Sequence, residues 1–264
     1  MTRMKLKTLF FLFHQLLRRD LDSRFRGSSL GWLWAFTVPL IMLAVYSFVF
    51  GVVFKVRWGS VAENSETNFA LNLFAGIILH GLLAEALNRA PSVLQQHASY
   101  VKKIIFPLWL LPVVTTTGAL VFAAISGLIL LVAFVFMQGI PPLHSLLIPL
   151  IVLPLYLFAL GGAWFLAALG AYVRDIVQII PLLTTILMFM APIFYPASAI
   201  PEEYRNWLLL NPLTYAVDAV RNLLFFAQPP GLWSLLAYTG CACLTAAAGL
   251  LFFLKVRRGF ADVL

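Results

Sequence analysis

Charge is scarce in this sequence, and the long gaps between charged residues define its class. Asp, Glu, Lys and Arg make up 11% of the 264 residues, whereas about a quarter is usual in a soluble domain. Residues 27–54, 104–173, 176–201 and 222–254 carry no charge. About 20 apolar residues cross a bilayer core as a helix, and the short segments of alternating polarity that build membrane barrels are missing. The sequence therefore predicts an all-α, polytopic membrane protein with one domain over residues 1–264.

Motifs for catalysis and nucleotide binding are also missing. The sequence has no HExxH, no GxSxG and no GxxxxGK[ST], and its four histidines are scattered at positions 14, 80, 97 and 144. We therefore expect no catalytic residue, no metal site and no ATP bound to this chain. His80 is the only titratable residue near the middle of a predicted span, whereas ion-coupled carriers usually place Asp, Glu or Arg there. This scarcity argues against a secondary carrier.

The apolar pattern predicts six spans, at about 33–54, 69–88, 107–137, 146–172, 176–195 and 232–254. The 70-residue uncharged run must hold two of them, because Gly139-Ile140-Pro141-Pro142 would break a helix. If the N-terminus is cytoplasmic, 14 of the 18 Lys and Arg residues lie inside and four lie outside. The sequence thus predicts cytoplasmic termini. The net charge of +8 belongs to loops that fix this topology, so nucleic acid is not an expected partner.

Two cytoplasmic segments have the spacing of amphipathic helices. The first covers about residues 4–26, with an apolar face of Leu6, Leu9, Phe10, Phe13, Leu16 and Leu17. It runs without a linker into Trp32 and Trp34, at the usual belt position of a membrane interface, which indicates a stiff joint. The second covers 92–103, where Ser92 and Gln95 have capping-box spacing. Each segment either rests on the membrane surface as an anchor or docks onto a cytoplasmic partner.

The segment between the fifth and sixth spans predicts two short helices on the outer side. Pro201 and Glu202 suit a helix start, and Asn211-Pro212 ends that helix. In the second helix Asp218 and Arg221 are three residues apart and can pair. We expect a re-entrant pair, with a helical loop resting on the outer leaflet as the alternative.

Small and aromatic residues mark the spans. Ala159, Ala163, Ala167 and Ala171 recur every four positions, which predicts a helix-packing stripe. Aromatic faces stack on sugar rings but also face lipid, and buried Tyr and Trp need a hydrogen-bond partner. The candidates for a polar channel lining are Tyr46, Trp109, Tyr156, Trp164, Tyr172 and Tyr195.

Several segments resemble one family along nearly the whole chain. The family is the type-2 ABC transporter permeases that export bacterial surface polysaccharides such as O-antigen, capsule or teichoic acid. The segments that look like it are residues 19–54, YVKKIIFPLWLLPV (100–113) and NPLTYAVDAVRNLLF (211–225). They look most like the O-antigen branch. The resemblance implies a homodimer in the bacterial inner membrane. It also implies a separate cytoplasmic ATPase dimer that binds ATP and Mg, and an undecaprenyl-linked glycan as cargo.

The resemblance also assigns roles to residues. It makes 4–26 the interface helix, 92–103 the coupling helix and 197–227 the outer gate. The implied ATPase contacts are Arg18, Arg19, Arg24, Arg26, Gln95, Gln96, His97, Ser99, Tyr100, Lys102 and Lys103. The implied gate residues are Tyr204, Trp207, Asn211, Pro212, Tyr215, Asp218 and Arg221. The rival hypotheses are a drug or lipid exporter of the same type, a secondary carrier, or a stand-alone scaffold.

Overall fold

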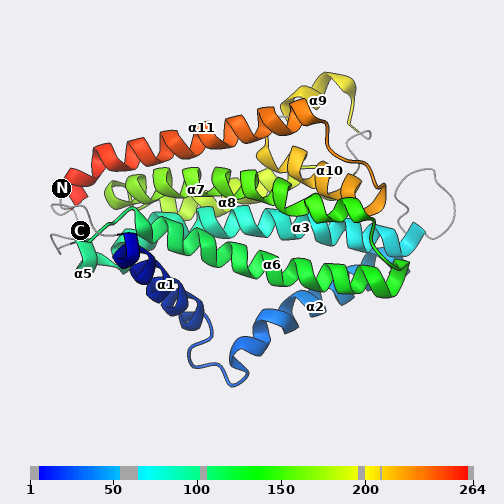
Figure 1. The fold of residues 1–264 in the computed structure, drawn as a ribbon, viewed down its shortest axis with the longest axis horizontal. Helices are drawn as coiled ribbons and strands as arrows, with labels where there is room; N and C mark the ends of the chain where they lie inside the picture. Colours follow the sequence, from blue (N-terminus) through cyan, green and yellow to red (C-terminus); the bar gives the residue numbers. More distant parts are fainter. Residues whose placement is uncertain (1–5, 54–64, 102–105, 196–199, 209, 261–264) are drawn as a thin grey trace.

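The protein is a bundle of long helices joined by short turns. A computed structural model describes residues 6–53, 65–101, 106–195, 200–208 and 210–260, and these form helices and turns without a strand. The helices run roughly along one direction, and the start of α1 (Leu6–Ser23) lies at the same end as the end of α11 (Leu232–Val256) (Figure 1). This confirms the all-α, polytopic prediction.

Within the described residues, five helices are long and apolar enough to cross a membrane. They are α2 (Trp34–Tyr46) with its π-helical extension η2 (Ser47–Val53), α3 (Ser65–Arg89), α6 (Leu110–Gln138), α7 (Ile148–Tyr172) preceded by η4 (Leu143–Leu147), and α11, which continues into η6 (Arg257–Gly259). The sixth apolar helix, α8 (Ile176–Phe189), has 14 residues and rises only about 21 Å. The fifth predicted span, 176–195, is therefore helical over a shorter stretch than expected.

Helix α7 lies at the centre of the bundle, because its small residues allow close approach. Ala159, Ala163 and Ala167 are fully buried. A Cβ atom added to Gly161 would lie 2.6 Å from the carbonyl oxygen of Thr245 in α11, so only glycine fits there. The predicted small-residue stripe is thus a packing surface within the protomer.

Helices α1 and α2 form a V whose tip projects from the bundle (Figure 1). None of the residues of α1 is buried, although one side packs against α6. The joint between the two helices turns at Gly27 and Gly31, whose φ values of 86° and 51° suit glycine, and leads through η1 (Gly31–Leu33). Most of the apolar surface of α2 is exposed, with Leu40 at 52% and Ile41 at 51%.

The predicted coupling helix is divided. After η3 (Ala90–Ser92), α4 (Val93–Gln96) and α5 (Ala98–Val101) are single turns separated at His97, where φ and ψ are −118° and 29°. The predicted capping box is wrong, because Ser92 Oγ donates to the carbonyl of Arg89 and Gln95 is used elsewhere. Residues 102–105 lie outside the described residues.

The outer helical pair consists of α9 (Glu202–Leu208) and α10 (Pro212–Phe225). Helix α10 begins inside the bundle and runs toward the end away from the termini (Figure 1). Nine of its 14 residues are buried, and it packs against α3 and α7. Because protein surrounds it, α10 fits the re-entrant prediction better than a loop resting on the leaflet.

Candidate functional site

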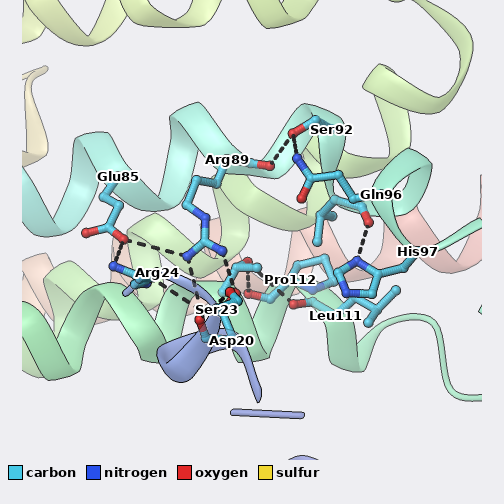
Figure 2. Close-up of polar contacts among 12 residues, drawn as sticks. Asp20, Ser23, Arg24, Glu85, Arg89, Ser92, Gln96, His97, Leu111 and Pro112 are labelled. Atoms are coloured by element: carbon cyan, nitrogen blue, oxygen red, sulfur yellow. Dashed lines mark hydrogen bonds and ion pairs between the residues drawn. The ribbon is translucent and has the colours of Figure 1, made fainter. Parts of the chain in front are cut away.

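Four charged side chains join the C-terminal part of α1 to the C-terminal end of α3. Arg89 donates to both carboxylate oxygens of Asp20, from Nη1 to Oδ2 at 3.1 Å and from Nη2 to Oδ1. Arg24 forms ion pairs with Glu85 and with Asp20, the latter at 3.5 Å, and Arg89 Nη1 lies 3.7 Å from Glu85 (Figure 2). Two cations and two anions therefore alternate in a neutral cluster, which we call the junction.

The junction is largely withdrawn from solvent. The side chains of Asp20 and Arg24 are 9% and 18% exposed, and those of Glu85 and Arg89 about 30%. Burial lowers the pKa of the Arg24 guanidinium, while the Glu85 carboxylate acts in the opposite direction. Because arginine starts from a very high pKa, it keeps its charge. Removing one member would leave a partly buried charge without its partner, which is costly.

An aromatic cluster stiffens the joint beside these charges. Phe25, Trp32 and Phe122 lie with ring centroids 5.5 to 6.3 Å apart. The Arg24 guanidinium carbon lies 4.2 Å from the Phe122 ring centroid, which is a cation–π contact. Trp32 Nε1 also donates to Asp22 of α1 at 3.2 Å. Trp32 thus has a structural role beyond the predicted position at the membrane interface, because it ties α1 and α6 to the start of the first span.

The coupling segment 90–101 is attached to the same unit. Arg19 Nη1 of α1 donates to the Tyr100 hydroxyl at 3.2 Å. Gln95 Nε2 donates to the Gly170 carbonyl near the end of α7 at 2.9 Å, and Val93 and Leu94 are buried in the core. A cavity of about 240 Å³ lies between α1, α4, α6 and the end of α3. The segment is therefore fixed to α1, α7 and the core while part of its surface faces outward.

The turn between α9 and α10 is held by polar contacts at the other end of the bundle. Asn211 caps α10, since its Oδ1 accepts from Leu213 N at 3.0 Å, and its Nδ2 donates to the Leu187 carbonyl of α8 at 2.8 Å. Thr214 Oγ1 donates to the Leu208 carbonyl. The Tyr238 hydroxyl of α11 donates to the Pro212 carbonyl at 2.9 Å. One turn thereby joins α8, α9, α10 and α11.

Arg221 fastens the middle of α10 to two further elements. It is 3% exposed. Its guanidinium donates to the carbonyl of Asn72 in α3 from Nε at 3.2 Å and Nη2 at 3.0 Å, to Ile193 at 2.8 Å, and to Pro192. Gly76 gives it room, because a Cβ there would lie 3.3 Å from Arg221 Nη2. The predicted partner Asp218 interacts with this arginine electrostatically, and the sequence did not predict the hydrogen bonds to backbone carbonyls after α8 and in α3.

The predicted ATPase contacts fall into two groups. Arg18, Arg19, Arg26 and Gln96 are exposed, and His97 and Tyr100 are half-buried. Arg24 and Gln95 also make contacts inside the chain, with Glu85 and with Gly170, and their role as partner contacts stays a prediction. Only the helical backbone of Ser99 is described, and Lys102 and Lys103 lie outside the described residues.

The predicted channel and gate aromatics are distributed over several helices. Trp164 is buried and donates to the Trp109 carbonyl at 2.9 Å; Tyr156 shares a hydrogen bond with Thr117, and Tyr172 donates to the Val256 carbonyl. Tyr195 donates to the Phe189 carbonyl. Tyr46 and Tyr215 are half-buried, and Trp207 is 62% exposed. Only the backbone of Tyr204 is described. Their role along a channel stays a prediction.

Asp20 is the main residue that sequence reasoning missed. It follows Phe13, Leu16 and Leu17 at helical spacing, so a carboxylate continues the face that packs on the bundle. Such a position needs a buried partner. This pattern indicates that Asp20 has a partner. Arg24 lies four residues away, at the spacing of a helical ion pair, whereas Arg89 lies 69 residues away and has no local signal.

These features describe a polytopic membrane protein with two short helical elements fixed to its spans at one end and a re-entrant pair at the far end. The family model of the ABC-2 type transporter matches residues 12–225, so the chain belongs to that family.

Its relatives include O-antigen export system permease proteins RfbA. The one from Myxococcus xanthus is 28% identical over 94% of this chain and 93% of its own length, and one from Klebsiella pneumoniae is 26% identical over 97% and 96%. The polysialic acid transport protein KpsM of Escherichia coli is 22% identical over 78% of each chain.

Proposed function

We propose that this chain is the membrane subunit of an ATP-driven exporter that moves a lipid-linked polysaccharide, O-antigen on undecaprenyl diphosphate, across the bacterial inner membrane. The chain works as a homodimer with a separate ATPase dimer, and both termini are cytoplasmic. The cargo class is supported by the similarity to O-antigen export system permease proteins, which extends over more than 90% of the chain.

The observation that carries the proposal is the junction. A transporter subunit without an ATP motif must receive work from outside. The interface helix α1 and the coupling segment 90–101 present the exposed Arg18, Arg26 and Gln96 while both are tied to spans. In this mechanism, closure of the ATPase dimer pushes on α1 and the coupling segment. The joint at Gly27–Gly31 passes the motion to α2, and α3 passes it toward α10.

The cargo is tested by depleting the protein in its own host and analysing the lipid-linked glycans of the inner membrane. We expect a long undecaprenyl-linked polymer to accumulate and the same polymer to disappear from the surface. An unchanged glycan pool would exclude polysaccharide as the cargo, and a drug or lipid exporter of the same type would replace the proposal.

The ATPase partner is tested separately in a reconstituted complex. Arg18→Glu with Arg26→Glu should reduce transport-coupled ATP hydrolysis, because both side chains are exposed and sit beside the junction without belonging to it. Lys255→Glu near the end of α11 is the matched control, since it reverses an exposed basic charge on a helix other than α1. Equal ATPase rates in all variants would refute the docking role of α1.

A further inference from the structure

An apolar crevice of about 560 Å³ lies between α3, α6, η4, α7 and α10. Among the described residues that line it, Ser145 alone has a polar side chain. Leu128 and Leu146 at its rim are 57% and 73% exposed, whereas Leu79 and Val220 on its walls are each 4% exposed. The crevice therefore leads from the outer surface of the bundle to the buried helix α10.

The crevice lies among helices that are long and apolar enough to span a membrane. It is formed by the spans α3, α6 and α7 in the half of the bundle away from the termini, where η4 follows the α6–α7 turn (Figure 1). Among the described lining residues, a water molecule in the crevice could bond to one side-chain hydroxyl, that of Ser145. An ordered buried water usually needs two to four polar partners, so the site does not suit water. An empty space of this size would lose its packing contacts. A hydrocarbon chain would pack against the apolar side chains that line the crevice, and it needs no hydrogen-bond partners.

We propose that one acyl chain of a membrane phospholipid occupies this crevice and packs against α10. The volume lies within the range of about 300–1,000 Å³ that is usual for ligand sites. A polyprenyl chain is several times longer than an acyl chain, and the buried wall of α10 closes the crevice at its inner end. A phospholipid tail entering from the leaflet beside η4 therefore fits better than the isoprenoid of the cargo.

The occupant would touch the helix that Arg221 fastens. Val220 and Leu224 of α10 line the crevice on either side of Arg221 in the sequence. A tail bound there supports one side of α10 while the guanidinium holds the other to α3 and the segment after α8. The proposal is independent of the cargo, because it concerns a lipid of the surrounding membrane.

Gly127 allows the crevice to be filled by mutation. A Cβ added there meets no atom within 4 Å, so Gly127→Leu can place its side chain in the space. Gly240→Leu on α11 is the matched control, because that glycine is exposed, also has open space around it, and lies on a helix that does not line the crevice. Ala124→Leu at the same crevice is a second filling variant if the first does not assemble.

The experiment uses the full chain in nanodiscs containing a phospholipid with a diazirine near the end of one acyl chain. After illumination, mass spectrometry of peptides maps the labelled residues. We expect label on Val220 and Leu224, which lie behind the rim, several times more often than on buried residues of α11. Gly127→Leu or Ala124→Leu should abolish it, and Gly240→Leu should leave it unchanged.

Two results would overturn the proposal. The first is label that is confined to exposed surfaces, or label on α10 that persists in both filling variants. Either pattern would show that the label comes from ordinary surrounding lipid and that no acyl chain occupies the crevice. Displacement of the label by a free polyprenol, but not by unlabelled phospholipid, would assign the crevice to an isoprenoid. Size-exclusion profiles and thermal transitions matching the parent chain establish that each variant compared is folded.

Discussion

Asp20→Asn removes one negative charge from the centre of the junction and keeps nearly the same side-chain shape. In the parent chain one carboxylate oxygen accepts from Arg89 Nη1 at 3.1 Å and lies 3.5 Å from Arg24 Nη2, and the other accepts from Arg89 Nη2. Asparagine keeps one acceptor but presents an N–H donor in place of the second oxygen. Arg24 and Arg89 are then left to share Glu85.

The expected cost follows from these contacts. A hydrogen bond to a charged group contributes about 1.5–3 kcal/mol, and one of the two from Arg89 is lost. The Arg89 side chain is 31% exposed, so water replaces part of that interaction. We therefore expect α1 to lose about 1–2 kcal/mol of its attachment to α3, a factor of roughly 5–30 in the ratio of attached to detached α1.

Spin labels on α1 and α3 measure this attachment as a distance distribution, alongside partner-stimulated ATP hydrolysis. Asp20→Asn should broaden the distribution and lower the stimulation. The control is Asp22→Asn, the same chemical change on the same helix, because asparagine keeps an oxygen that can still accept from Trp32 Nε1. Asp22 is 55% exposed and lies 3.9 Å from Arg18, a pair that contributes only about 0.3–0.5 kcal/mol. Equal distributions in the two variants would refute a structural role for the junction.

Three further variants test other contacts by thermal unfolding of the purified protein. Trp32→Phe keeps an aromatic ring but removes the donor to Asp22; it should cost about 0.5–1.5 kcal/mol, and an unchanged transition would remove that bond from the joint. Asn211→Ala removes the cap of α10 and should cost about 1 kcal/mol, whereas Asn211→Asp keeps the capping oxygen but puts a buried carboxylate against the Leu187 carbonyl in place of the Nδ2 donor and should cost at least as much. Gly249→Val forces α11 away from Gly161 and should cost about 1–3 kcal/mol or more; a tolerated valine would contradict the close packing.

The fold was largely predictable because its main signals are local. Uncharged length defines the spans, and the Gly139–Pro142 break separates α6 from α7 as expected. The ends of helices were predicted less well, because tertiary contacts decide where they fall. Helix α8 ends at Phe189 rather than near 195, and the coupling segment breaks at His97. Gln95 had capping-box spacing, but Gly170 lies close enough to take its amide instead.

The site was less predictable because its partners are distant in the sequence. The sequence marked Arg24 as a basic residue near the cytoplasm, which equally suits an exposed contact or a buried ion pair. Only the packing of α1 against α3 and α6 places Glu85 and Phe122 beside it. Arg221 is similar, since Asp218 is near in sequence while the carbonyl of Asn72 lies 149 residues away.

Helix α3 connects the two ends of the proposed mechanism, and this makes a final prediction. It carries Glu85 and Arg89 in the junction and the Asn72 carbonyl that Arg221 binds. Glu85 follows Asn72 by 13 residues, so the two sites are about 20 Å apart along the helix. Changes that far apart normally add within about 0.3–0.5 kcal/mol.

If α3 moves as one rigid element, Asp20→Asn and Arg221→Lys should not be additive in partner-stimulated ATP hydrolysis, since each already releases α3 from one neighbour. A lysine cannot reach all three carbonyls that the guanidinium binds. We expect a coupling of about 1 kcal/mol or more. Asp20→Asn combined with Tyr238→Phe is the control, because Tyr238 holds the Pro212 carbonyl from α11 and not from α3. Additivity in the first pair would mean that α3 does not transmit the motion, and that the gate responds through α2 or α8 instead.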